Sequence, residues 1–409
     1  MSKIRIAFIK FAGLSAGGTE RWLQMMAANL PKNEFKIDYY YCDSCQYVGS
    51  GYKHSDTNQN RLKYMLVHNI NLIKFKIGKK DITKPTHDWI NTDFWEIFDE
   101  KKYDLVQTAK AGPKEYPYYL INLPIIEFIS LNAGVDFSSN IAWSIHLSQW
   151  QRIRWHKKGG NIQRSSIIPI PASPPSSNQN LREKLNIPDN AIIAGFHQRN
   201  DDNIFSPIPL EAFSKLNNNN YHFIIMGGGE KYKEQAKELG IKNIHFLNHC
   251  GSDEEISQFL NTLDIFAHGR KDGETFGTVF AEAMMHGLPC LSHWSPIANA
   301  QQETMSTGGL FAKDLNDYTK KLKILFEDIN LIKKLALNGK KYAQENYSIK
   351  SCINKLSNIY RNIIEEKRRG LFKTNKYQNE NLLKFKNSRI VKYICNPYNI
   401  FKKLKEKTL

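Results

Sequence analysis

The chain has 409 residues, of which 41% are hydrophobic and 12% aromatic, and its 57 Lys and Arg outnumber 40 Asp and Glu to give a net charge of +17. Because a domain usually holds about 100–200 residues, this length predicts two domains and excludes a small disulfide-stapled module. One quarter of the residues are charged, which together with the abundant aromatics is typical of a folded protein rather than a disordered one.

No stretch reaches the ~18 uncharged apolar residues of a membrane-spanning helix, and Lys10 interrupts the first apolar run before a signal-peptide core is complete. We therefore expect a soluble, unexported, cytoplasmic protein. Its six cysteines are scattered along the chain, which predicts reduced thiols rather than a disulfide framework. Cys42 and Cys45 form a C-x-x-C pair without a second pair or a histidine cluster, so we interpret them as cysteines at a strand end rather than as a metal or redox site.

The first half of the chain has the pattern of a parallel α/β domain. Residues 3–9 form a short apolar run, followed by a glycine-bearing loop and a helical pattern that extends to Leu30. A strand, a glycine loop and a helix in this order open a parallel α/β sheet. Further strands are predicted at residues 35–41, 103–108, 125–131 and 141–146. Residues 167–178 are rich in Pro and Ser, which is incompatible with a helix or a central strand and predicts an interdomain linker.

The alternation restarts after this linker and predicts a second parallel α/β domain. Its strands are expected at residues 191–196, 222–226, 244–247, 263–267 and 288–292. Apolar residues then recur at helical spacing between Ile349 and Ile363, which predicts an amphipathic helix. We thus expect Rossmann-like domains at 1–170 and 171–346, the helix at 347–366, and a basic tail at 367–409.

The predicted tail holds most of the positive charge. Residues 367–409 contain thirteen Lys and Arg and two Glu, a net +11, which leaves +6 for the preceding 366 residues. Apolar residues alternate with these charges, as in segments that lie on anionic membrane surfaces, although a solvated basic helix fits equally well. A second basic and apolar stretch spans residues 71–80. No nucleic-acid-binding module accompanies either stretch, so we expect no nucleic-acid partner.

The most informative segment contains Glu274 and Glu282. The sequence predicts a helix that begins near Gly277 and stops at Gly287. Backbone N–H groups of Phe276, Gly277 and Thr278 at its start, together with the helix dipole, form an anion site suited to a phosphate group. Two carboxylates that flank such a site suit a sugar nucleotide, one contacting the sugar and the other the ribose. The alternative is a solvated helix face.

With Gly277, small residues at 281 and 283 and Gly287-Leu288-Pro289, this segment resembles the Glu, seven residues, Glu signature of the family 4 retaining glycosyltransferases. The resemblance covers most of residues 3–365 and implies a GT-B fold, with two Rossmann-like domains, one for the acceptor and one for the donor nucleotide, facing each other across a cleft. Similar family features are the strand and glycine loop at 225–230, the approach to the signature at 244–267, and the closing segment at 302–311.

Roles follow from the resemblance position by position. Glu274 would contact the transferred sugar, Glu282 the ribose, and Arg199 the diphosphate. Glycines of two loops would also bind the donor: Gly17 and Gly18 in the first domain and Gly228 in the second.

The chain departs from the family pattern in three places. The Lys-Gly pair expected after the arginine is replaced by residues 200–206, and we expect Arg270 and Lys271 to substitute for the missing lysine. A first-domain histidine is absent, which leaves Asn132 or nothing beside the reacting sugar. His268-Gly269 stands where a Pro-Ser pair is common. These changes indicate tolerated drift, altered donor choice or lost activity.

The resemblance implies transfer of a sugar, with retention, from a nucleotide-diphosphate sugar to a hydroxyl of a glycan, polysaccharide or lipid-linked acceptor. We expect no cofactor and no metal, because no Asp-x-Asp triplet is present and Arg199 with the helix start would stabilise the leaving diphosphate. Alternatives are a GT-B sugar-nucleotide epimerase, a phosphorylase, or a non-catalytic protein that binds a nucleotide sugar or a partner. The tail would place the enzyme at the inner face of a membrane.

Overall fold

The computed structural model describes residues 3–10, 13–42, 57–76, 93–111, 121–131, 134–216, 218–249 and 252–372. These residues fall into two compact units, each with its own sheet. Unit 1 holds the described residues up to His146, Arg154–Ser166, and those from Lys355 onward, and unit 2 holds Leu147–Ile153 and Ile167–Asn354. Each unit is thus assembled from separate segments rather than from the continuous ranges 1–170 and 171–346.

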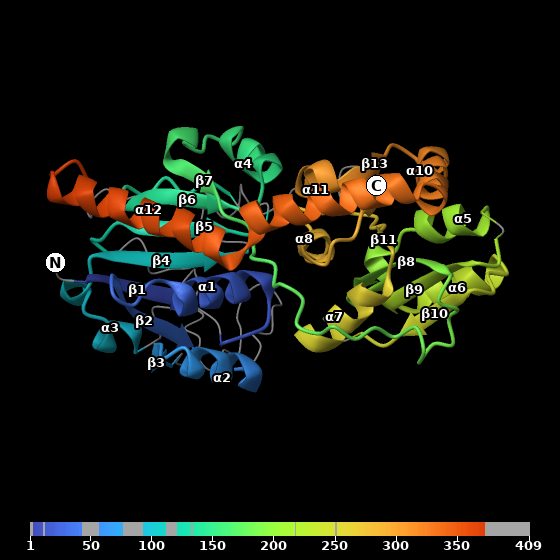
Figure 1. Cartoon of the computed structure of the whole chain (residues 1–409). Helices are drawn as coiled ribbons and strands as arrows, with labels where there is room; N and C mark the ends of the chain where they lie inside the picture. Colours follow the sequence, from blue (N-terminus) through green and yellow to red (C-terminus); the bar gives the residue numbers. More distant parts are fainter. Residues whose placement is uncertain are drawn as a thin grey trace, which may run out of the picture. The chain divides into compact units, whose positions relative to one another are not determined.

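The sheet of unit 1 has the strand order β3-β2-β1-β4-β5-β6-β7 (Figure 1). Neighbouring strands from β3 to β6 pair in parallel. This order is the doubly wound Rossmann arrangement, as predicted. The strands are β1 (Ile4–Lys10), β2 (Phe35–Cys42), β3 (Asn71–Phe75), β4 (Leu105–Lys110), β5 (Ile125–Ile129), β6 (Ile141–His146) and β7 (Ser165–Ile167).

The sheet of unit 2 has the order β10-β9-β8-β11-β12-β13, which repeats the same topology, again in parallel. Its first five strands in sequence are the five predicted ones, while β13 was not predicted as a strand. The strands are β8 (Ile192–Gln198), β9 (Tyr221–Gly227), β10 (Ile244–Leu247), β11 (Ile265–Ala267), β12 (Cys290–His293) and β13 (Gly309–Ala312).

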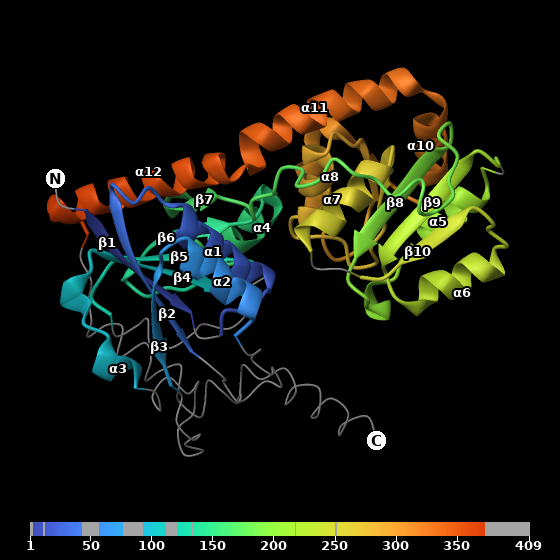
Figure 2. The same ribbon diagram turned by 60° about the horizontal axis from the view of Figure 1, so that its bottom comes forward.

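Helices cover both faces of the second sheet, with α6 on the face opposite α7 and α8 (Figure 2). Burial of both faces explains why β11 and residues 223–226 of β9 read as continuous apolar runs in the sequence. The helices of unit 2 are α5 (Ile208–Ser214), α6 (Glu230–Glu238), α7 (Asp253–Thr262), α8 (Thr278–Met285), α9 (Ala300–Met305), α10 (Leu315–Glu327) and α11 (Ile329–Tyr347).

The core of unit 1 forms between its sheet and the first helix. The indole of Trp22 on α1 stacks on the ring of Phe128 on β5, with centroids 3.9 Å apart and planes 2° from parallel. Both side chains are fully buried, so this contact fixes α1 on the sheet. The other helices before residue 160 are short: α2 (Gln59–Val67), α3 (Phe94–Ile97) and α4 (Gln149–His156), beside α1 (Gly18–Asn29).

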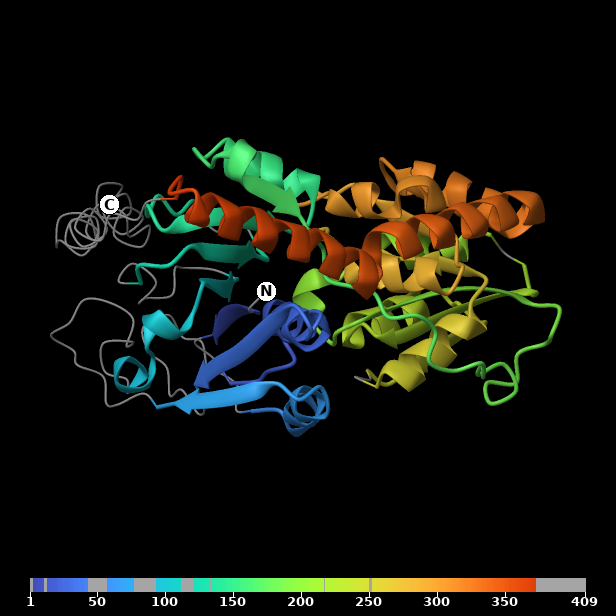
Figure 3. The same cartoon turned by 60° about the vertical axis from the view of Figure 1, so that its left-hand side comes forward.

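The predicted amphipathic helix is α12 (Ile349–Arg368), and its C-terminal part belongs to unit 1 (Figure 3). The Tyr360 hydroxyl donates to Gln107 Oε1 on β4 at 2.7 Å, and both residues are fully buried. One helical position further on, Arg361 forms two hydrogen bonds of 2.7 Å with the Glu34 carboxylate. The chain therefore returns to close the core of its first unit after completing the second.

The segment predicted to link the domains has no helix or strand between Ile167 and Ile192. Its backbone is held by unit 2, because Ser176 and Ser177 donate their N–H groups to Ser257 Oγ on α7. Cys45, Asn132 and the tail from residue 373 lie outside the described residues. Within the described part of the chain, no helix combines the length and apolarity needed to cross a membrane.

Candidate functional site

The segment with the two predicted glutamates begins at the carboxyl end of β11 and continues into α8. Because the strands of unit 2 are parallel, the loops that follow β8, β9 and β11 leave the same edge of the sheet. These loops carry Arg199, Gly228 and Glu274. Ligands in open α/β sheets bind at this edge, where the order of the strands reverses.

Gly277 starts helix α8 from a left-handed conformation, with φ 86° and ψ 70°. A Cβ atom there would lie 2.7 Å from the Phe280 ring, so this position requires glycine. No side chain caps the helix, whose first residue is Thr278. A helix start without a side-chain cap is able to bind an anion, and binding by the first N–H groups of α8 stays a prediction.

The Glu274 backbone is held by helix α9. Its N–H donates to Gln301 Oε1 at 3.1 Å, and its carbonyl accepts from the Ala300 N–H at 2.9 Å. Gly273 precedes it at φ 65°, packed so closely that a Cβ atom would lie 1.8 Å from the Ala298 carbonyl oxygen. Two glycines and a buried amide thus determine where the carboxylate projects.

Arg270 contacts the Glu274 carboxylate and is itself held by a second acid. Its guanidinium forms a bidentate pair with Asp272, and Nη1 lies 3.2 Å from Glu274 Oε1. Burial alone would lower the pKa of Arg270, but these carboxylates raise it above its ordinary value. A fixed cation therefore accompanies Glu274 in the site.

The Glu274 carboxyl titrates abnormally. Burial raises its pKa above the ordinary value, whereas the charge of Arg270 and, more weakly, that of Arg199 lower it. Arg199 therefore lies close enough to Glu274 for their charges to interact. Its side chain is 61% exposed and forms one ion pair, with Asp201 at 2.9 Å, so it can reorient toward a ligand.

Glu282 lies on α8, and sequence reasoning missed its neighbour on β8. His197 Nε2 is 3.5 Å from Glu282 Oε2. Burial, reinforced by the charges of His249 and His286, lowers the pKa of His197 to about 4. The imidazole is therefore neutral at pH 7, and this contact is polar rather than an ion pair. His197 stands two residues before Arg199, and that proximity was the available signal.

The remaining predicted donor-binding residues lie in both units, some at glycine turns and others with buried or exposed side chains. Gly228 follows β9 at φ 86°. The Phe276 side chain is buried edge-on against Tyr347, so only its backbone is available to a ligand. Gly17 and Gly18 begin α1 in unit 1, where a Cβ on Gly17 would lie 2.6 Å from Glu20 Oε2. Lys271 is exposed and lines a separate cavity of unit 2.

The departures from the family pattern have structural counterparts. Ile204, within the segment that replaces the Lys-Gly pair, is buried, and its carbonyl accepts the Lys271 N–H at 3.1 Å. His268 is enclosed by the rings of Phe196, Phe266 and Phe280, and neither ring nitrogen has a hydrogen-bond partner. Burial lowers its pKa well below the ordinary value, so it packs as a neutral ring.

Within the described residues, no group of three or more His, Cys, Asp and Glu side chains is arranged to hold a metal ion. The site instead offers two carboxylates, two arginines and an uncapped helix start. This set can accept hydrogen bonds from hydroxyl groups and stabilise a phosphate.

Comparison with known proteins agrees with this geometry. Residues 177–342 match the family model described as glycosyl transferases group 1. No curated protein matches the sequence. A glycosyltransferase from Rickettsia africae ESF-5 is similar in structure, with a TM-score of 0.66 and 16% identity over 89% of this chain and 99% of the other.

Two further solved structures share the fold. HepE from Anabaena, crystallised with UDP, gives a TM-score of 0.65 and 16% identity over 88% of this chain and 100% of its own. A putative UDP-N-acetylglucosamine 2-epimerase from Listeria monocytogenes gives a TM-score of 0.56 and 14% identity over 89% of this chain and 98% of its own. Residues 177–342 thus match the glycosyl transferases group 1 model, and the two Rossmann-like sheets give the chain the GT-B fold of these structures.

Proposed function

We propose that this chain is a glycosyltransferase that takes its sugar from a nucleoside-diphosphate sugar and transfers it to a hydroxyl acceptor with retention of configuration and without a metal. The observation that carries the proposal is the placement of Glu274 and Glu282 on either side of the uncapped start of α8. The Anabaena HepE structure in complex with UDP supports a nucleotide donor, and UDP-sugars are the first donors to test.

The residues of unit 2 that would bind the diphosphate have distinct roles in this proposal. The diphosphate lies at the N–H groups of Phe276, Gly277 and Thr278, where the helix dipole stabilises the charge that develops on the leaving group. Arg199 turns from Asp201 toward the same phosphates. Arg270 takes over the charge of the family's lysine, since it is fixed beside Glu274.

The two carboxylates act at opposite ends of the donor. Glu274 accepts hydrogen bonds from hydroxyls of the sugar that is transferred, and Arg270 opposes the rise in its pKa that burial causes. Glu282 accepts from the ribose hydroxyls, with the neutral His197 beside it. The acid that binds the transferred sugar affects the transition state, whereas the acid that binds the ribose affects mainly ground-state affinity.

A paired substitution tests these roles. Glu282→Ala should raise the KM for the donor, while Glu274→Ala should mainly lower kcat. Because a hydrogen bond to a charged group contributes about 1.5–3 kcal/mol, each change should cost roughly ten- to a hundredfold. Glu238→Ala, an exposed residue near the end of α6, is the matched control. A Glu274→Ala/Glu282→Ala double variant with full activity would exclude this site.

Thermal-shift screening of sugar nucleotides should identify the donor first, since a ligand at 100 times its Kd stabilises the protein by ~2.7 kcal/mol. Product analysis then separates the rival activities. Conversion of the sugar nucleotide without any acceptor would indicate an epimerase. Binding without turnover over a broad acceptor panel would indicate a non-catalytic protein, and transfer with inversion would refute retention.

We also propose that the basic tail attaches the enzyme to an anionic membrane, which suits a lipid-linked or polysaccharide acceptor. The support is its composition, thirteen cationic against two acidic side chains in residues 367–409. Co-sedimentation with liposomes that contain anionic lipid should be lost after deletion of residues 371–409 and should weaken with salt. Binding that survives deletion, or that ignores salt, contradicts the proposal.

A further inference from the structure

Unit 2 contains a second cavity, of about 490 Å³, that none of the proposed donor-binding carboxylates or arginines lines. Three lysines from separate elements border it: Lys231 on α6, Lys271 after β11, and Lys313 after β13. Its wall includes Pro207, Trp294 and Pro296. A volume in this range, with an apolar wall and a few charged groups, is typical of small-molecule sites.

The lysines in the lining of this cavity outnumber its acidic residues. Among the described residues, none of the three ammonium groups forms an ion pair. Asp202, the acid in the lining, accepts the backbone N–H of Lys231 at 3.2 Å. Burial lowers the pKa of His293, so that ring adds no charge at pH 7. Outside the lining, Asp317 accepts the Lys313 backbone N–H at 2.9 Å, and the charge of Lys313 helps to lower the Asp317 pKa. Even with this second acid, cations outnumber carboxylates around the cavity, which favours an anionic ligand.

Trp294 provides a fixed and uncovered aromatic surface in the wall. The Trp294 backbone N–H donates to the Ala312 carbonyl at 2.8 Å, and the Trp294 backbone carbonyl lies 2.7 Å from His293 Nδ1. The side chain is nevertheless 54% exposed, and Ile297 three residues later is 60% exposed. Of the two, Trp294 lines the cavity, and aromatic side chains are typical of small-molecule sites.

Lys271, on the loop that carries Glu274, has its backbone fixed by hydrogen bonds beside this cavity. The Lys271 N–H donates to the Ile204 carbonyl, and its carbonyl accepts from Ser295 Oγ at 2.8 Å. Arg270, one residue earlier, contacts Glu274 instead. The loop thus presents one cation to the proposed donor site and the next cation to the second cavity.

We propose that this cavity binds an acidic sugar, a sugar ring that carries a phosphate or a carboxylate. The ring lies against the indole of Trp294, and the acidic group lies among the three lysines. The charge and the apolar wall come from the structure, while the choice of a carbohydrate rests on the chain being a glycosyltransferase. Such a site would recognise an anionic unit of a glycan beside the place where a sugar is transferred.

Calorimetry and tryptophan fluorescence with four probes test this proposal without any turnover. Glucose 6-phosphate and glucuronate should bind, glucose should bind at least tenfold more weakly, and inorganic phosphate should compete with the acidic sugars. Trp294→Ala should reduce binding of both acidic sugars but not that of phosphate. Comparing glucose 6-phosphate with glucuronate shows which acid the lysines prefer.

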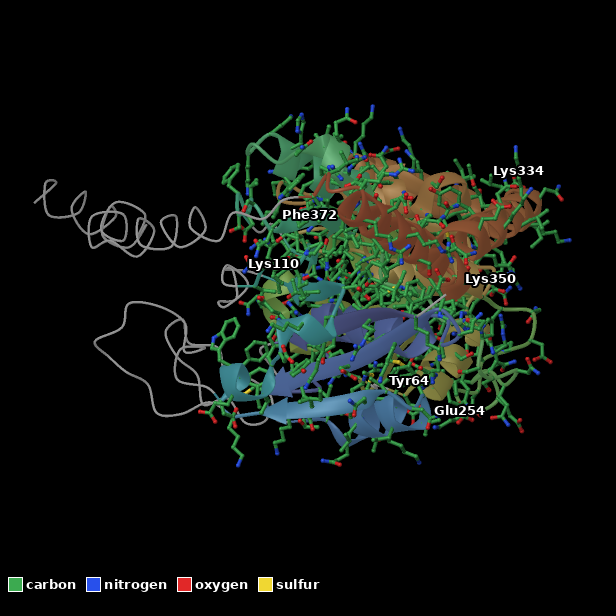
Figure 4. The ribbon with its side chains drawn as sticks, turned by 90° about the vertical axis from the view of Figure 1, so that its left-hand side faces the viewer. Tyr64, Lys110, Glu254, Lys334, Lys350 and Phe372 are labelled. Carbon is green, nitrogen blue, oxygen red and sulfur yellow. The ribbon has the colours of Figure 1, made fainter. Side chains whose placement is uncertain are left out.

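A charge variant and its control complete the test. The Lys231→Gln/Lys271→Gln/Lys313→Gln variant should lose acidic-sugar binding by tenfold or more. A matched variant changes the exposed lysines Lys334, Lys341 and Lys350, two of which are labelled on α11 and α12 (Figure 4), and should bind as the unaltered protein does.

Three results would overturn the inference. They are no binding of either acidic sugar, unchanged binding in the triple cavity variant, or loss of binding in Glu282→Ala, which would place the probe in the donor site. Since Glu282→Ala affects nucleotide binding and the lysine variant affects acidic-sugar binding, failure of this inference and failure of the proposed function give different results.

Discussion

Replacing Gly273 by alanine should disable the loop that presents Glu274, and the cost can be worked out from the structure. The alanine Cβ would lie 1.8 Å from the Ala298 carbonyl oxygen, whereas real Cβ atoms essentially never come within 3.0 Å of another atom. The backbone must therefore separate by about 1.2 Å. A misplacement of about 1 Å typically costs about a hundredfold in rate, so kcat/KM for sugar transfer should fall by that factor.

Gly240→Ala is the matched control for this prediction. Gly240 has φ 62°, close to the 65° of Gly273, but no atom lies within 4 Å of the position that a Cβ would take there. Both variants incur the left-handed cost of roughly 1–2 kcal/mol, which urea unfolding would measure. Only Gly273→Ala should also lose transfer activity. If both variants transferred sugar equally fast, close packing of Gly273 on Ala298 would not be what positions Glu274.

Three further changes test the charges and the core. Arg270→Gln removes the cation that opposes the raised pKa of Glu274, so that pKa should rise further, and the acidic limb of the kcat/KM profile should move to higher pH; an unmoved limb would show that ionised Glu274 is not required. Lys110→Met should destabilise unit 1 by about 3–5 kcal/mol in urea unfolding because it leaves Glu127 charged and buried, whereas the Lys110→Met/Glu127→Leu double variant should recover most of that loss. Tyr360→Phe should cost about 1–3 kcal/mol, since its buried amide partner on β4 loses its hydrogen bond; unchanged unfolding would mean that α12 does not stabilise unit 1 through this contact.

Several strands could be predicted because they are largely buried, although β10 was also predicted as a half-buried edge strand from its apolar residues. β11 is apolar throughout and β9 contains an apolar run at residues 223–226, and such runs identify central parallel strands. β3 was missed because it contains an asparagine and a lysine, both exposed, and β13 because it has only four residues and begins with a glycine. Both strands lie at the edge of a sheet, where one side has no neighbour and the pattern weakens.

The bounds of α8 were also predictable, since the glycines at 277 and 287 mark its start and end locally. The partners of the two glutamates were not. Gln301 reaches Glu274 from 27 positions away, and His197 reaches Glu282 from a different strand. No spacing in the sequence indicates such contacts, because they depend on the order of strands in the sheet.

The amino-acid sequence alone determined the two parallel α/β sheets, the glycine-started helix and the acids that flank it, because burial and backbone geometry act over a few neighbouring residues. Tertiary structure decided which charges meet. It joined Arg270 to Glu274 and sent Lys271 to a separate cavity, although the two cations are adjacent in the chain. Hydrogen bonds hold a residue's backbone in place and so fix where its Cα–Cβ bond points. For Lys271 these hydrogen bonds come from Ile204 and Ser295, which are distant in the sequence.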